Sequence, residues 1–170
     1  LGKKFSIEYS VNALNIHRLK ILKENSDYVL FWDANNGEIP KENINKIINS
    51  KGDLWHIGSK IGLSTSPNLL DFIQPTSMLN LSIKDTLDHS SWRHTFKGSL
   101  MKFRVFKETQ LSNYSNSLDI IGLDFGYKSM RSGVLTRYSH LLLKEKIRAT
   151  SLGLNKSEEL LFIRNNFDSK

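Results

Sequence analysis

The feature that most constrains the fold is the stretch of residues 28–40, where an apolar run passes directly into a polar turn. Its first five residues, from Tyr28 to Trp32, are all aromatic, aliphatic or β-branched, as in a buried strand. Acidic, amide, glycine and proline residues follow from Asp33 to Pro40, and such residues form turns. The sequence therefore predicts a buried strand that delivers the Asp33 carboxylate to its own C-terminal end.

This position favours a binding site. In open α/β sheets ligands bind at the carboxyl ends of the strands, because the loops that leave these ends form a crevice. Asp33 and Asn35 place two side-chain oxygens there, two residues apart. A hard divalent cation that carries the phosphates of a substrate binds through one or two such oxygens and water. The alternative is an Asp/Asn turn without a ligand, because both residue types also favour turns.

Length and composition predict a single domain over residues 1–170, and its expected class is α/β. The chain is 39% hydrophobic and 24% charged, which is ordinary globular usage. It has no cysteine, so disulfides and thiolate metal sites are excluded. No apolar run approaches the roughly 20 residues of a membrane span, and the first residues show no signal-peptide pattern. We expect a soluble, cytoplasmic protein.

Periodicity predicts the order of the elements. Apolar residues at three- and four-residue spacing indicate amphipathic helices, and short apolar runs between turns indicate strands. The expected elements are a strand or loop tail at 5–9, a helix capped by Asn12 at 13–23, strands at 28–32 and 54–58, a helix at 41–50, a loop-rich segment at 59–75, a short helix or loop at 81–88, a helix at 125–132, a strand from Val134, and a last helix capped by Ser157.

The net charge of +7 is concentrated in one half of the chain. Between His89 and Arg148 there are eleven Lys or Arg and four acidic residues, whereas the remainder has thirteen of each. A basic half suits a phosphate-bearing partner: a nucleotide sugar, an anionic membrane surface or nucleic acid. The alternative for each residue is a solvated surface position.

The Asp33 turn resembles the metal and nucleotide-sugar motif of GT-A-fold glycosyltransferases of family 2. The likeness is carried by Asp33, Ala34, Asn35, Pro40, Ile44, Ile47 and Ile48. It implies a GT-A-like mixed sheet flanked by helices, and Mg²⁺ or Mn²⁺ held by Asp33 and Asn35. It also implies an inverting transfer of sugar from a nucleotide-sugar donor to an acceptor hydroxyl. Residues 53–56 and 71–80 are similar to a bacterial subgroup of this family.

The helix ahead of the strand extends the resemblance, because family members commonly carry an Ala-Arg-Asn element there. Arg18 is the approximate match and a candidate for the diphosphate, with a surface position as the alternative. About 12 residues precede this helix, too few for a βαβ unit of about 30 residues. The resemblance therefore implies the central and C-terminal part of such a domain, or a reduced relative without catalysis.

The stretch from Ser90 to Phe106 resembles the strand and turn that family members place beside the acceptor. Trp92 is the candidate for stacking on a sugar ring, because its flat π-face matches the apolar face of a pyranose. The alternative is a core tryptophan. Arg93 and Lys97 are candidates for stabilising a leaving diphosphate.

The segment of residues 118–134 resembles the part of the family that supplies the catalytic base. The matching positions are Asp124, Gly126, Tyr127, Lys128 and Gly133. The Glu-Asp pair of the family falls on Ile121 and Gly122, so Asp119 or Asp124 would have to replace the base. Asp124 is alternatively the N-cap of the helix at 125–132. Some family members carry a metal-binding His after the next strand. His140 lies closer to the end of that strand than this His does, so it does not match that position.

Two functions from different classes follow. One is a metal-dependent glycosyltransferase, or part of one. The other is a non-catalytic basic module that binds nucleic acid or another polyanion, which the charge distribution and the missing Glu-Asp pair favour. The lack of regular basic and aromatic interleaving disfavours this module.

Overall fold

The computed structural model describes residues 4–9, 13–19, 26–39, 41–58, 87–143 and 154–167. The expected Asn12 cap, the end of the first helix, the loop-rich segment at 59–75 and most of the segment at 81–88 lie outside these residues. Within them, no helix is long and apolar enough to cross a membrane.

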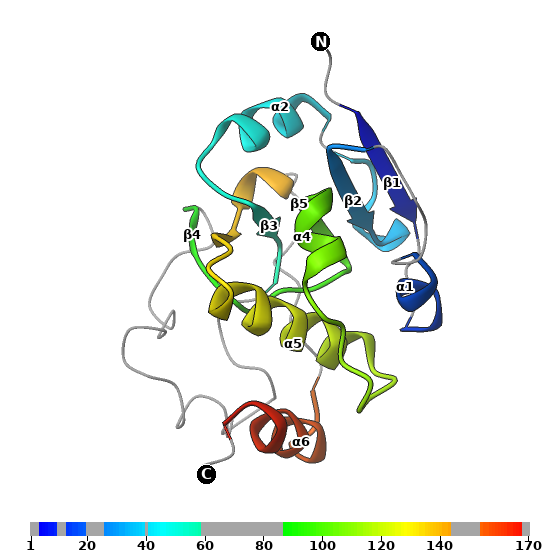
Figure 1. Cartoon of the computed structure of the whole chain (residues 1–170). Helices are drawn as coiled ribbons and strands as arrows, with labels where there is room; N and C mark the ends of the chain where they lie inside the picture. The colour runs from blue at the N-terminus through cyan, green and yellow to red at the C-terminus, as the bar shows by residue number, and fades with distance from the viewer. Residues whose placement is uncertain are drawn as a thin grey trace.

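The described chain contains both strands and helices along its length (Figure 1). In order, the elements are β1 (Phe5–Tyr9), α1 (Ala13–Leu19), β2 (Tyr28–Trp32), η1 (Ala34–Asn36), α2 (Lys41–Asn49), β3 (Leu54–His56), β4 (His89–Ser90), β5 (Gly98–Lys102), α4 (Phe103–Glu108), α5 (Leu118–Arg131), β6 (Thr136–Tyr138), η3 (His140–Leu142) and α6 (Lys156–Phe167). The expected α/β class is confirmed.

The strands form one mixed sheet in the order β1-β2-β5-β3-β6-β4. β1 pairs parallel with β2, and β3 pairs parallel with β6, whereas β5 is antiparallel to both β2 and β3. β4 is antiparallel to β6. Four strands therefore end at one edge, where β5 and β4 begin. We call it the carboxyl edge, and the opposite one the amino edge.

The continuous apolar run of β2 is explained by burial on both faces of the sheet. All five of its side chains are buried. Val29 and Phe31 pack into one core with α1, α4 and α5, whereas Leu30 and Trp32 pack into a second core with α2 and η3. Since successive side chains of a strand point to opposite faces, a central strand covered on both sides needs apolar residues throughout.

The helix α5 also joins the sheet to an outer layer. A third apolar cluster lies between α5 and α6, and Figure 1 shows α6 on the far side of α5 from the sheet. On its inner side α5 lies close to residues 91–96, which connect β4 to β5. A Cβ at Gly126 would lie 2.2 Å from the Trp92 carbonyl oxygen, and one at Gly122 would lie 3.1 Å from that of His94. Glycines four residues apart therefore allow this close approach.

Two expected helix caps are wrong. α5 begins at Leu118 after the N-cap Ser117, so Asp124 lies inside the helix and is not its cap. The last helix is capped by Asn155, not Ser157: the Glu158 amide donates to Asn155 Oδ1 (3.0 Å), and the Asn155 amide donates to Glu158 Oε2 (2.9 Å). This reciprocal pair is a capping box, which requires the acidic residue three positions after the cap.

Candidate functional site

The register of the sheet carries four residues into one row just past the strands at the carboxyl edge. Continued by one or two residues past the paired strands, the register places Asp33, Lys97, Gly58 and His140 in this row. The Asp33 amide donates to the Lys97 carbonyl (2.8 Å), and the Ser139 amide donates to the His56 carbonyl (3.0 Å). Because neighbouring strands are about 4.8 Å apart, Asp33 and His140 are separated by three such steps, roughly 14 Å.

The turn at Asp33 is confirmed and is held firmly against β5. One carboxylate oxygen of Asp33 accepts the Asn35 amide (2.9 Å) and so caps η1. The Asn36 side chain donates to the Lys97 carbonyl (2.6 Å). Asp33 is half-buried and Asn35 is exposed. The Asp33 carboxylate therefore both builds the turn and remains at the solvent boundary, so metal binding there stays a prediction.

Lys97 connects this turn to Asp119. Its Nζ lies 2.8 Å from Oδ1 and 2.9 Å from Oδ2 of Asp119, in the first turn of α5. Both side chains are largely buried, with 30% and 14% exposed. The structure thus brings together three residues that the sequence singled out for different roles: the Asp33 ligand, the Lys97 cation and the Asp119 base.

Trp92 and Arg93 lie beneath this edge, in the interior. The Trp92 ring is 2% exposed, stacks on Phe162 at 5.8 Å between centroids, and meets Tyr127 edge-on. This position fits the alternative of a core tryptophan, and sugar stacking stays a prediction. The Arg93 side chain is also fully buried. Arg18 is exposed on α1.

Asp124 is enclosed among donors from three segments. Its carboxylate lies 2.7 Å from Lys128 Nζ and accepts hydrogen bonds from the Tyr114 hydroxyl (3.0 Å) and Asn166 Nδ2 (2.9 Å). Burial, and then the charge of Asp124, raises the pKa of Tyr114. Because Asp124 is fully buried, this network acts as a tie between α5, α6 and the loop before α5. Its role as a base stays a prediction.

The sequence analysis missed a second polar pair at the carboxyl edge. The Asp88 Oδ1 atom accepts hydrogen bonds from His140 Nδ1 (2.6 Å) and from the His140 amide (2.9 Å), while its Oδ2 accepts the Ser139 hydroxyl (2.9 Å). The His140 side chain is 40% exposed. The pairing of β4 with β6 brings Asp88 and His140 together, although they lie 52 positions apart in the sequence.

Two buried histidines, His56 and His94, lie close to the carboxyl edge. His56 Nε2 bonds the Ser91 carbonyl (3.0 Å), and the Gly58 amide donates to His56 Nδ1 (3.1 Å). Burial lowers the pKa of His56 to about 4, and burial followed by the nearby His56 lowers the pKa of His94 well below its usual value. Both imidazoles are therefore neutral at pH 7, and His56 is a structural residue.

The described residues fit a divalent metal only as a partial site. They contain no group of three or more His, Cys, Asp or Glu that could hold an ion. Asp33 and Asn35 supply two oxygens, one of them on an exposed amide. Because Mg²⁺ is commonly bound by one or two carboxylates together with substrate phosphates and water, such a pair suffices only when a phosphate donor completes the set.

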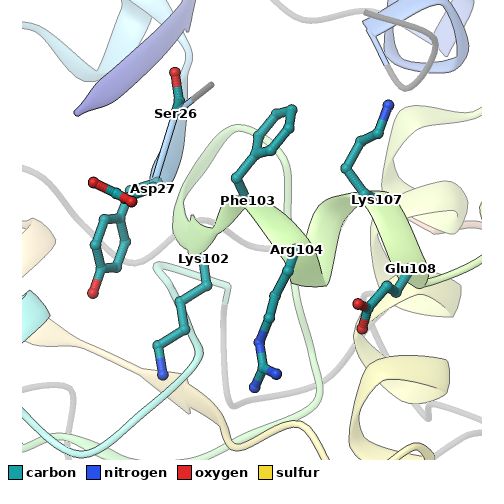
Figure 2. Close-up of a pocket in the computed structure, with 8 residues that line it drawn as sticks. Ser26, Asp27, Lys102, Phe103, Arg104, Lys107 and Glu108 are labelled. Carbon is teal, nitrogen blue, oxygen red and sulfur yellow. The ribbon is translucent and has the colours of Figure 1, made fainter. Parts of the chain in front are cut away.

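Two grooves in the described part of the chain lie at the amino edge, away from these residues. One groove of about 680 Å³ is lined by Asp27, Lys102, Arg104 and Lys107, among others (Figure 2). A neighbouring groove of about 480 Å³ shares Arg104 and reaches Lys128, Ser132 and Gly133.

The charges at the amino edge are largely satisfied by one another. Asp53 accepts Lys102 Nζ (2.7 Å) and the Leu135 amide (3.1 Å), and lies 3.9 Å from Arg104. Burial raises the pKa of Asp53, but the bonds and charges of Lys102, Leu135 and Arg104 outweigh it and lower the pKa. The basic half of the sequence is thus partly neutralised by local ion pairs at Lys97, Lys102 and Lys128.

Comparison of the chain with protein-family models, curated proteins and solved structures found no match.

Proposed function

We propose that the chain is a metal-dependent glycosyltransferase, or part of one, that works at the carboxyl edge of its sheet. The observation that carries this proposal is a set of connected polar residues at that edge. The Asp33 turn, Lys97 and Asp119 are joined by direct contacts, at the side of a mixed α/β sheet where strand-end loops form ligand sites.

Asp33, Asn35, Lys97 and Asp119 each have a chemical task in this proposal. Asp33 and Asn35 hold a divalent ion against the diphosphate of a nucleotide sugar. Lys97 stabilises the negative charge that develops on the leaving diphosphate, and Asp119 orients the Lys97 ammonium through both of its oxygens. The ion, when bound, supplies further positive charge to the same phosphates. The acceptor hydroxyl attacks the anomeric carbon from the opposite side, which inverts the configuration.

The test separates the charge of Asp33 from its capping bond. Calorimetric titration with UDP, GDP, TDP, CDP and their common sugar conjugates is done with Mn²⁺ and again with chelator. Asp33→Asn keeps a side-chain oxygen that can cap η1 but removes the negative charge. Asp33→Ala removes both. We expect metal-dependent binding to the wild type and at least a tenfold loss in both variants.

A matched control is Glu42→Gln, which removes an exposed acid from the first turn of α2, the helix after the turn. It should bind like the wild type. Binding that is equal with Mn²⁺ and with chelator, or that survives in Asp33→Asn, would contradict the metal site. If no nucleotide binds the wild type, the transferase proposal fails.

A further inference from the structure

We propose that His140, oriented by Asp88, is the proton acceptor for the attacking hydroxyl at the carboxyl edge. This inference rests on the proposed transferase function and gives His140 a role that the sequence resemblance does not. It is carried by the geometry of the Asp88–His140 pair, by its place in the row, and by the burial of the other candidates.

The contacts of Asp88 fix the orientation and tautomer of the imidazole. At 2.6 Å from a carboxylate oxygen, His140 Nδ1 carries the hydrogen and donates it. The neutral ring therefore holds its lone pair on Nε2, which is the proton-accepting atom. Two more donors, the His140 amide and the Ser139 hydroxyl, hold the carboxylate in place. A carboxylate that orients a histidine in this way also stabilises the imidazolium when it forms.

The carboxylates of α5 are less suited to this task. Asp124 is fully buried and already accepts bonds from Tyr114 and Asn166. Both oxygens of Asp119 lie within 2.9 Å of the Lys97 ammonium. Ile121 and Gly122 are buried against the core and against residues 94–96. Among these groups and the Asp88–His140 pair, the histidine side chain is the most exposed.

The place of His140 suits a base that acts on an acceptor beside a donor held at Asp33. The two positions are about 14 Å apart along one edge, by three interstrand steps. A sugar and its diphosphate fill a gap of this size. The helix that follows the Asp33 turn is also fixed to the His140 segment, because Asn43 Nδ2 donates to the Leu141 carbonyl (3.0 Å). The helix after the Asp33 turn and the His140 segment are thus in direct contact.

The reaction step is balanced without a further reactant. The acceptor oxygen forms a bond to the anomeric carbon while the bond from that carbon to the diphosphate oxygen breaks. The bonding electrons leave with the diphosphate. The hydroxyl proton passes to His140 Nε2, and water then takes it from the imidazolium. The products are the glycoside, or the free sugar where water is the acceptor, and the nucleoside diphosphate.

The test measures release of nucleoside diphosphate from UDP-glucose, UDP-N-acetylglucosamine, GDP-mannose and TDP-glucose with Mn²⁺, with water as acceptor. His140→Asn keeps a side-chain N–H that can bond Asp88 but has no base. We expect kcat to fall 100-fold or more, as for loss of a general base, while calorimetric donor affinity stays within twofold. Asp88→Asn is expected to lower kcat about tenfold or more, because it no longer fixes the tautomer.

The pH–rate profile separates a base from a structural residue. The pH–rate profile of His140→Asn should differ in shape from that of the wild type, because the variant lacks the proton-accepting group. The described segments around His140 carry the ionisable groups Asp88, His89, Arg137, His56, Lys41, Glu42 and Lys46. His17→Gln, at an exposed histidine on α1, is the matched control and should match the wild type in rate and profile.

The outcomes distinguish this inference from the proposed function. Donor binding with unchanged turnover in His140→Asn, or a larger loss in Asp119→Asn than in His140→Asn, overturns the assignment of the base and leaves the transferase standing. Donor binding without any turnover in the wild type overturns it as well. If no donor binds the wild type, the proposed function and this inference fail together.

Discussion

The two edges of the sheet differ in what their polar residues do. At the amino edge two grooves are present, and Lys102 and Arg104, which line them, both pair with Asp53. At the carboxyl edge the polar residues are spread along one row, and His140 keeps a partly exposed ring beside its carboxylate. These two grooves and the candidate chemical site therefore lie at opposite edges of the sheet, and a site chosen from the grooves alone would lie at the edge whose charges are paired.

The largest effect on this difference between the edges is expected from a substitution that disturbs the packing of α5 next to the carboxyl edge. Gly126→Ala places a Cβ 2.2 Å from the Trp92 carbonyl oxygen, so α5 or residues 91–96 must move. We expect a loss of about 3 kcal/mol in the free energy of unfolding, measured by urea denaturation. Gly133→Ala at the amino edge has open space but a φ of +87°, and should cost only about 1 kcal/mol. Equal losses would contradict the tight contact at α5.

Acid should lower the free energy of unfolding in two steps, first through His56 near the carboxyl edge and then, at lower pH, through Asp53 at the amino edge. His56 has a pKa of about 4 in the fold and 6.5 when unfolded, so the unfolded chain binds more protons between these values. Stability is therefore full above pH 6.5 and falls as the pH drops towards 4, by about 2 kcal/mol between pH 7 and pH 5 from His56 alone. His94 acts in the same direction.

The amino edge should follow at lower pH. The pKa of Asp53 is lowered in the fold, so its stabilisation is present above the ordinary Asp value and is lost as the pH falls through the folded value. Urea denaturation across pH 3 to 8 measures both steps. A His56→Gln variant should show a shallower slope between pH 7 and pH 5, and an unchanged slope would show that His56 is not the source.

The parts of the fold that follow local patterns were predictable, and those that depend on remote partners were not. The strand at residues 28–32 and the helix after Pro40 were expected from adjacent residues and are confirmed. The start of α5 was missed because Asp124 looks like a cap. Its charge is tolerated inside the helix since Lys128, Tyr114 and Asn166 meet it there.

The same distinction applies to the candidate site. The Asp33 turn was visible because its residues are contiguous, and Lys97 and Asp119 were chosen singly without a reason to place them in contact. No sequence signal links Asp88 to His140, since only the pairing of β4 with β6 joins them. An acidic residue just before a short strand and a histidine just after another are the weak signs that were available.

The ion pairs of the two edges should separate stability from binding. Asp53→Asn leaves Lys102 without its carboxylate at 2.7 Å, and we expect a loss of about 1 kcal/mol in stability with unchanged nucleotide affinity. Asp119→Asn should cost a similar amount, because its pair with Lys97 is exposed to a similar degree, but it should also weaken donor binding about tenfold. Denaturation and calorimetry on both variants measure the two effects. Weaker nucleotide binding in Asp53→Asn would place the site at the amino edge.

The smallest effect on stability is expected from substitutions in the groove of Figure 2. These substitutions test the polyanion-binding alternative. Arg104 and Lys107 line this groove from exposed positions on α4. The double variant Arg104→Gln/Lys107→Gln should change stability by no more than about 0.5 kcal/mol, since exposed charges contribute little. Under the transferase proposal its metal-dependent nucleotide affinity stays at the wild-type value. A basic module would instead bind heparin or single-stranded DNA with a steep salt dependence, and the double variant would lower that slope by up to about two. The two functions use opposite edges. A lower salt slope of polyanion binding in the double variant therefore favours the basic module, and an unchanged metal-dependent nucleotide affinity favours the transferase.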